Sequence, residues 1–207
     1  ITDHKGILAD SEINTVLITT QHGSHAMFVS EALESDKHVF VEKPLCLNYN
    51  ELLEIDAAKK ETGKNVVVGF NRRFSPHAQK VKQYLGNQPG PMTIIATMNA
   101  GFVPQDSWIH HPELGGGRII GEACHYVDLI SFFTGSRVNE VYMQAMGKDH
   151  TILTDIASIH LKYENGSLGV INYFSNGHKS YTKERIEFYY EGKNLVIDNF
   201  RRLEGYG

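Results

Sequence analysis

The feature that most constrains the fold is a repeat of short apolar runs and helical stretches in the first third of the chain. Residues 14–19 form a nearly continuous run of β-formers, which predicts a strand buried on both faces of a parallel sheet. Residues 22–35 follow, with apolar side chains at helical spacing. Parallel strands need crossover helices between them, so this β-α step is typical of a doubly wound sheet.

The step recurs directly afterwards. His38–Val41 predicts a second strand, and Asn48 is a suitable cap for a helix from Tyr49 to about Thr62. Gly63 then ends that helix before a third strand at residues 65–69. A run of three strands is too short for a complete sheet of this type, so residues 1–70 are predicted to form only part of one.

The pattern changes near residue 71. We expect a helix over 75–85, a strand over 92–98, a long loop over 101–118 and a helix over about 122–134. Further strands are predicted at residues 138–146, 157–163, 168–174, 185–190 and 195–198. Hairpin turns at Asn165-Gly166 and Glu191-Gly192-Lys193 imply antiparallel neighbours. Residues 71–207 are therefore predicted to be an α+β domain, with a mostly antiparallel sheet and helices on one face.

Composition excludes several classes of partner. The net charge is -4, from 20 basic and 24 acidic residues, and no basic run interleaves with aromatics, which argues against nucleic acid. No apolar run is long enough to span a membrane, and no signal segment opens the chain. The two cysteines, Cys46 and Cys124, favour a reducing compartment, so we expect a cytoplasmic protein. Because the chain opens on Ile1 inside a helical pattern, we also expect the natural start to lie upstream.

Lys43 is the first candidate for chemistry. The run Val39-Phe40-Val41-Glu42-Lys43-Pro44 puts a charge pair and a proline at the carboxyl end of a predicted parallel strand. Ligands of open α/β sheets bind outside those ends. A surface Glu-Lys pair before a loop proline would give the same pattern, and spacing alone does not separate the two interpretations.

Four motifs in order carry a family resemblance. They are residues 13–20 followed by His25, Glu42-Lys43-Pro44, the run Asn71-Arg72-Arg73-Phe74-Ser75-Pro76, and Gly115-Gly116-Gly117 followed by His125 and Asp128. Together they resemble the glucose-fructose oxidoreductase and inositol dehydrogenase family (Gfo/Idh/MocA), over nearly the whole chain. The resemblance implies the C-terminal part of a Rossmann dinucleotide-binding domain in residues 1–70. It implies a substrate-binding and oligomerisation domain in residues 71–207.

The resemblance also implies an activity: NAD(P)-dependent oxidation or reduction at a hydroxyl or carbonyl of a sugar, sugar nucleotide or cyclitol. Lys43 and His125 would face the substrate as the acid/base residues, with a cis bond between Lys43 and Pro44. Hydride transfer at a carbinol carbon needs such a proton acceptor. Family members often pair through the second-domain sheet, so a homo-oligomer is expected.

One departure affects the predicted catalytic group. Many dehydrogenases of the family carry an Asp four residues before the histidine, and Gly121 stands at that position here. Glu122 is adjacent, but on an ideal helix it points about 100° away. We keep Glu122 as a candidate to orient His125; a helix-capping Glu beside a core-edge His is the alternative. A second departure is Thr20, where the family usually has proline.

No GxGxxG turn is present, and Gly115-Gly116-Gly117 follows no buried parallel strand, so we interpret it as a flexible or tightly turned substrate loop. We expect the stretch alone to bind cofactor poorly and to be inactive. The remaining candidates for the cofactor, NAD or NADP, are Thr19, Thr20, Gln21, His25, Glu42 and Lys43. The candidates for the substrate are Asn71, Arg72, Trp108, His110, His111 and His125.

Two alternatives stay open. His110, His111, His125 and Asp128 are metal-ligand types, but adjacent loop histidines rarely both ligate, and we expect no metal. The glycine at position 121 is compatible with a non-catalytic module that binds a ligand or serves assembly. The stretch from Gly115 to His125 and residues 199–204 resemble bi-domain oxidoreductases in which an alcohol-dehydrogenase-like region comes first.

Overall fold

The computed structural model describes residues 3–87, 89–148 and 154–207. Within them the chain forms two compact units. The first unit comprises the described residues up to Phe70 together with Trp108–Gly121. The second comprises the described residues of Asn71–Ser107 and Glu122–Gly207. The first unit is therefore discontinuous in sequence, because most of the loop predicted over 101–118 belongs to it.

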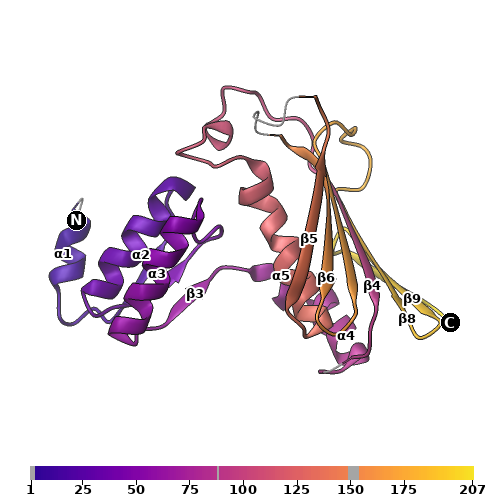
Figure 1. The fold of residues 1–207 in the computed structure, drawn as a ribbon, viewed down its shortest axis with the longest axis horizontal. Helices are drawn as coiled ribbons and strands as arrows, with labels where there is room; N and C mark the ends of the chain where they lie inside the picture. Colours follow the sequence, from indigo (N-terminus) through magenta and orange to yellow (C-terminus); the bar gives the residue numbers. More distant parts are fainter. Residues whose placement is uncertain (1–2, 88, 149–153) are drawn as a thin grey trace. The chain divides into compact units, whose positions relative to one another are not determined.

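The first unit has the predicted β-α order (Figure 1). Its elements are α1 (His4–Ala9), β1 (Thr15–Ile18), the 3-10 turn η1 (His22–Ser24), α2 (His25–Glu34), β2 (His38–Val41), α3 (Tyr49–Thr62), β3 (Val66–Val68) and the 3-10 turn η3 (Trp108–His110). The three strands are parallel, in the order β1-β2-β3. This confirms the partial Rossmann-type sheet.

Local chemistry sets the ends of α3. The Asn48 side chain accepts a hydrogen bond from the Glu51 amide at 3.0 Å, as an N-cap does. Gly63 ends the helix with φ at 66°, a conformation that glycine adopts without strain. Both predicted boundaries of this helix are confirmed.

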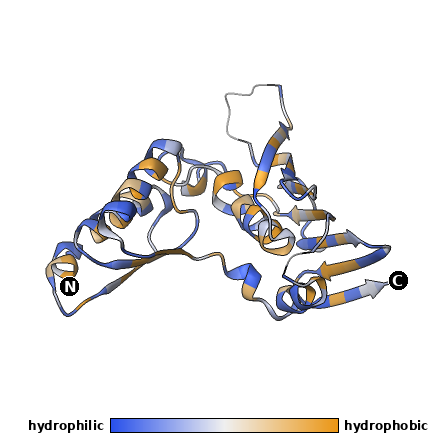
Figure 2. Cartoon of the chain, turned by 60° about the horizontal axis from the view of Figure 1, so that its bottom comes forward, coloured by the Kyte–Doolittle hydropathy of each residue, from blue (hydrophilic) through white to orange (hydrophobic). Residues whose placement is uncertain are grey.

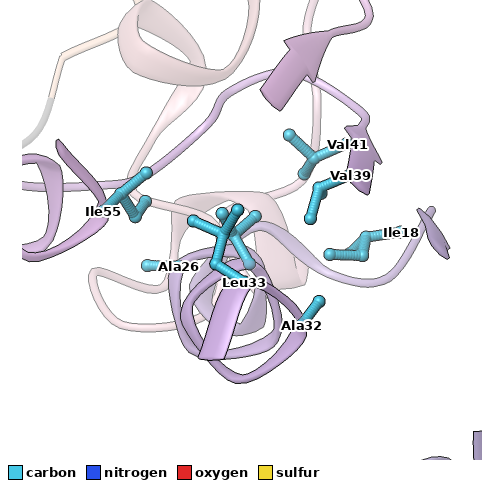
Figure 3. Close-up of a cluster of buried hydrophobic side chains, with 8 residues drawn as sticks. Ile18, Ala26, Ala32, Leu33, Val39, Val41 and Ile55 are labelled. Atoms are coloured by element: carbon cyan, nitrogen blue, oxygen red, sulfur yellow. The ribbon is translucent and has the colours of Figure 1, made fainter. Parts of the chain in front are cut away.

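The core of the first unit lies on one face of its sheet. Ile18, Val39 and Val41 point from the strands toward α2 and Ile55 of α3 (Figure 3). Hydrophobic and hydrophilic residues alternate along the helices, as expected for helices with one buried side (Figure 2). The expected burial of β1 on both faces is wrong for the described residues, because Leu17 is 69% exposed. The strands β1, β2 and β3 lie side by side in sequence order. Because crossovers between parallel strands are right-handed, α2 and α3 pack on the same face of this sheet.

The second unit is a sheet with two helices on one face (Figure 1). Its elements are the 3-10 turn η2 (Asn71–Phe74), α4 (Pro76–Leu85), β4 (Thr93–Asn99), α5 (Cys124–Thr134), β5 (Val138–Ala145), β6 (Ile156–Tyr163), β7 (Leu168–Phe174), β8 (Glu184–Tyr190), β9 (Lys193–Asp198) and β10 (Arg202–Tyr206). The strand order is β10-β9-β8-β4-β7-β6-β5. Buried and outward-facing residues alternate along β6 and β7, so the buried side of the sheet faces α5.

The turns of this sheet follow the sequence. Gly166, between β6 and β7, has φ at 89°, and Glu191 and Gly192, between β8 and β9, have φ at 48° and 74°. The two positive φ angles at Glu191 and Gly192 are what a type I′ hairpin turn requires, whereas the β6-β7 turn has one, at Gly166. The predicted antiparallel hairpins β6-β7 and β8-β9 are therefore confirmed.

Three features differ from the sequence-based expectation. The strand β4 lies in the middle of the sheet and pairs parallel with β7, so the sheet is mixed. The strand β10 was not predicted; its turn contains Asn199 and Phe200, both with positive φ, and no glycine. The helix expected from Glu122 begins at Cys124, because a π-helical turn, η4 (Ile119–Ala123), precedes it.

Candidate active site

Lys43 is the second residue after β2, at the carboxyl end of the parallel sheet. Backbone bonds fix this end: the Glu42 amide donates to Ile18 O at 2.9 Å, and the Gly69 amide donates to Val41 O at 2.8 Å. The Lys43–Pro44 bond is cis, as the family resemblance implies. Lys43 Nζ donates to the carbonyl oxygen of Gly121 at 2.8 Å. The ammonium is thus held by a neutral backbone group inside the first unit.

His25, a predicted cofactor residue, has a structural function in this unit. It is fully buried, and its Nδ1 lies 2.7 Å from Pro44 O while its Nε2 lies 3.0 Å from Thr20 O. Both carbonyl oxygens lie at hydrogen-bond distance from the ring, and because a carbonyl only accepts, a ring N–H is the donor. The ring ties the loop after β1 to the loop that contains Lys43. Thr19, Thr20 and Gln21 are exposed beside it.

The triple glycine is packed rather than open. A Cβ on Gly116 would lie 2.5 Å from Leu47 Cδ2, and one on Gly115 would overlap the Ile109 backbone. Gly23 is equally tight against Glu113, and its amide donates to Leu114 O at 2.9 Å. Of the two options predicted for this loop, the tight turn is present and the flexible one is not supported by these contacts.

His22 is a buried residue of the same region that the sequence analysis passed over. Its Nδ1 donates to Gly115 O at 2.9 Å, and its ring meets Trp108 edge-on at 5.0 Å between centroids. It lies directly over Gly121, where an added Cβ would be 2.8 Å from His22 Cε1. The available signal was its position: like Lys43, it follows the carboxyl end of a parallel strand.

The other predicted residues of the loop differ in their exposure and hydrogen-bond partners. Trp108 is 41% exposed, and His111 is exposed, with its Nδ1 accepting the Glu113 amide at 3.2 Å. The Nε2 atom of His110 is buried with no hydrogen-bond partner among the described residues. These residues therefore offer one exposed aromatic ring and one buried polar atom to a ligand.

In the second unit, the predicted acid/base residue His125 is the second residue of α5 and is 8% exposed. Glu122 lies in the π-helical turn just before it and accepts a hydrogen bond from Tyr173 Oη at 2.7 Å. Asp128 is held by Arg73, whose Nε donates to it at 3.0 Å. The carboxylates around His125 thus have partners of their own within this unit.

Arg72 is built into the fold of the second unit. Its guanidinium forms an ion pair with buried Glu184 and lies over the rings of Tyr126, at 5.3 Å, and Phe200, at 5.4 Å. Burial, with Glu184 as the next cause, raises the pKa of the Tyr126 hydroxyl well above its usual value. The neighbouring candidate Asn71 is exposed. Sequence reasoning named Arg72 without its partner, since Glu184 is distant in sequence.

Two further properties bear on function. No group of three or more His, Cys, Asp or Glu side chains among the described residues could hold a metal ion. No helix in the described part of the chain has the length and apolarity that crossing a bilayer requires. Within the described residues, neither Cys46 nor Cys124 is part of a disulfide.

Comparison with known proteins gives relatives over nearly the whole chain. It is 31% identical over 205 residues to the uncharacterized oxidoreductase YrbE of Bacillus subtilis, covering 96% of this chain and 59% of that protein. It is 28% identical over 211 residues to myo-inositol 2-dehydrogenase of Thermotoga maritima, covering 96% and 60%. The chain thus spans about three fifths of the length of these relatives.

The fold is shared with solved structures. The crystal structure of an oxidoreductase domain protein from Kribbella flavida superposes with a TM-score of 0.85 at 26% identity, covering 99% of this chain and 60% of that one. Residues 1–70 match the family described as "Oxidoreductase family, NAD-binding Rossmann fold", and residues 87–196 match the "GFO/IDH/MocA C-terminal domain". The chain belongs to the Gfo/Idh/MocA oxidoreductase family.

Proposed function

We propose that the protein containing this chain is an NAD(P)-dependent oxidoreductase that acts on a hydroxyl or carbonyl group of a sugar, sugar nucleotide or cyclitol. The observation that carries the proposal is the setting of Lys43. Its ammonium lies at the carboxyl end of β2, where ligands of such sheets bind, and is held through one hydrogen bond to Gly121 O. An ammonium has three N–H groups, so this bond leaves donors for a substrate oxygen.

The residues at this end of the sheet fit a dinucleotide. Thr19, Thr20 and Gln21 offer exposed hydroxyl and amide groups after β1, and Glu42 and Lys43 follow β2. We assign these five residues to the nicotinamide side of the site and assign His25 to the support of their two loops. When bound, the nicotinamide accepts or supplies the hydride at the carbinol carbon.

The proton of the reacting hydroxyl requires a separate acceptor. In the oxidation direction, a neutral Lys43 amine takes this proton, and in the reduction direction the ammonium returns it. His125 is the second acid/base residue in this proposal, because an imidazole changes charge near neutral pH. Glu122 is proposed to orient His125, and its hydrogen bond from Tyr173 holds the carboxylate in place within the second unit.

Two observations support the proposed substrate class: the names of two relatives, and the side chains of the Trp108–Gly121 loop. One relative is named myo-inositol 2-dehydrogenase and another levoglucosan dehydrogenase, so both act on polyhydroxylated rings. Trp108 offers a partly exposed ring for stacking, and the buried His110 Nε2 would gain a partner from a ligand hydroxyl. Asn71, Arg72 and His111 are further candidates for the substrate, and of these Arg72 is already paired with Glu184.

A non-catalytic module is the second candidate, favoured by the glycine at position 121. Measuring NADH binding and cofactor reduction by the full-length protein over a panel of sugars, nucleotide sugars and cyclitols separates the two. We expect binding with turnover of at least one panel compound. Binding of both NADH and a panel compound with no hydride transfer in either direction would favour the second candidate.

We also propose that the protein is a cytoplasmic homo-oligomer joined through the second-unit sheet. Strand register puts Leu168 and Tyr189 on the same face as Thr93, opposite the buried Ile94 and the helices, and both are 45% exposed. An open sheet face that exposes apolar side chains is a surface that a second subunit can cover. Sedimentation of the full-length protein tests this, and a monomer at high concentration contradicts it.

A further inference from the structure

Position 121 carries no side chain, and the space that a side chain would need is filled by His22. A Cβ on Gly121 would lie 2.8 Å from His22 Cε1 and 3.2 Å from His22 Nδ1. The first distance is shorter than real Cβ contacts. The glycine and the histidine are therefore one feature: the imidazole occupies the room beside the Gly121 backbone.

The His22 ring has a fixed orientation. Its Nδ1 lies 2.9 Å from Gly115 O, and since a carbonyl only accepts, this nitrogen carries a proton. The edge-on contact with Trp108 supports the ring from another side. The next residue, Gly23, packs against Glu113 and donates its amide to Leu114 O at 2.9 Å, so the turn that carries His22 is tied to the glycine loop. A ring fixed by these contacts can in turn fix what it packs against.

The His22 ring packs against Gly121, which is the hydrogen-bond partner of Lys43. The carbonyl of Gly121 accepts from Lys43 Nζ at 2.8 Å, while the α-carbon side of the same residue meets His22. We propose that His22 is a positioning residue for Lys43: its imidazole takes the room of the absent carboxylate side chain and holds the Gly121 carbonyl where it accepts from the lysine. This inference rests on the proposed function and names the residue that compensates for the glycine.

The first test measures steady-state hydride transfer by the full-length protein with variants His22→Ala and His22→Asn. His22→Ala is expected to lower kcat by about tenfold to 100-fold, as misplaced reacting groups do, and to change the pH profile of kcat, with NADH affinity unchanged. The asparagine amide can replace Nδ1 as the donor to Gly115 O, so His22→Asn should recover part of the loss. His38→Ala, at the opposite end of β2, also removes one hydrogen bond and should leave kcat unchanged.

The second test does not depend on turnover. Reductive methylation of the same folded variants, followed by mass spectrometry, reports how tightly each lysine amine is held. Lys43 should be modified several-fold faster in His22→Ala than in the parent and His22→Asn, while exposed Lys60 reacts equally in all of them. Equal Lys43 rates in the parent and both variants would overturn the positioning role even if the enzyme is active. If no hydride transfer is found in the parent, the proposed function fails, and the methylation rates still decide whether His22 holds Lys43.

Discussion

Lys43, His22 and His25 of the first unit have a different kind of partner from Arg72 and Arg73 of the second unit. In the first unit the partners are backbone carbonyls: Gly121 O for Lys43, Gly115 O for His22, and Pro44 O with Thr20 O for His25. In the second unit the partners are carboxylates: Glu184 for Arg72 and Asp128 for Arg73.

The difference bears on what each unit can do. A carbonyl orients an amine or imidazole without adding a charge, so the group can gain or lose a proton without breaking an ion pair. A buried carboxylate beside an always-charged guanidinium fixes both charges. These residues of the first unit are therefore held by neutral carbonyl groups, whereas the two arginines of the second unit are held by ion pairs.

The largest effect expected from this difference is on catalysis at Lys43. Lys43→Met keeps the length of the side chain and removes the proton-carrying group, so kcat/KM should fall by about 100-fold to 10,000-fold. Thermal unfolding should change little, because one part-buried hydrogen bond is lost. Lys60→Met, whose lysine is 73% exposed and pairs with Asp56, is the matched control. A Lys43→Met enzyme with the parent's kcat/KM removes Lys43 from the mechanism.

The next effect is on the stability of the second unit. Glu184→Gln removes the buried charge that balances Arg72, and leaving such a guanidinium unpaired should lower the free energy of unfolding by about 3 kcal/mol. Urea denaturation monitored by circular dichroism measures this. The double variant Glu184→Gln with Arg72→Met should regain much of the loss, since no unpaired charge remains. If Glu184→Gln has the same free energy of unfolding as the parent, the Arg72–Glu184 ion pair contributes nothing to stability.

A smaller effect is expected when a carboxylate is restored to position 121. Gly121→Asp forces a side chain against His22, and overpacking of this kind costs about 1–3 kcal/mol. We expect lower stability and no gain in turnover. Combining it with His22→Ala removes the clash and should restore the unfolding temperature. A single Gly121→Asp variant that is as stable as the parent and more active contradicts the packing argument.

The smallest effect concerns an exposed ion pair of the first unit. The hydrogen bond from Lys64, which lies 2.8 Å from Asp36, lowers the pKa of the Asp36 carboxyl. A lowered folded pKa contributes stability above the unfolded value of about 3.9 and loses it as pH falls through the folded value. Asp36→Asn keeps a residue that tolerates the φ of 62° found here. Its unfolding temperature should differ from the parent's only slightly at pH 7, and not at all near pH 2.

Much of the fold was predictable because its signals are local. Periodic apolar residues, the Asn48 cap and the Gly63 end specify α3 within a short stretch of chain. The place of β4 was not predictable, because its neighbours β7 and β8 come after a long loop and a helix. The strand β10 was missed for another reason: its turn uses Asn199 and Phe200 in place of the Asn-Gly that marks such turns.

The candidate site was predictable only in part. Lys43 and His125 were named as candidates because family motifs surround them, and the glycine at position 121 was named as a departure from the family pattern. The link from that glycine to His22 depends on a packing contact between residues far apart in sequence, which neither periodicity nor spacing encodes. The contacts of His25 were also not predictable from spacing, since its acceptors are two backbone carbonyls.

The discontinuity of the first unit has a consequence for its synthesis. A ribosome releases the three parallel strands and their helices well before Trp108–Gly121, because the start of the second unit is made in between. Domains generally fold as they emerge. Here Lys43 leaves the ribosome long before Gly121, so the contact between them and the packing of the glycine loop form only after β4 has been translated.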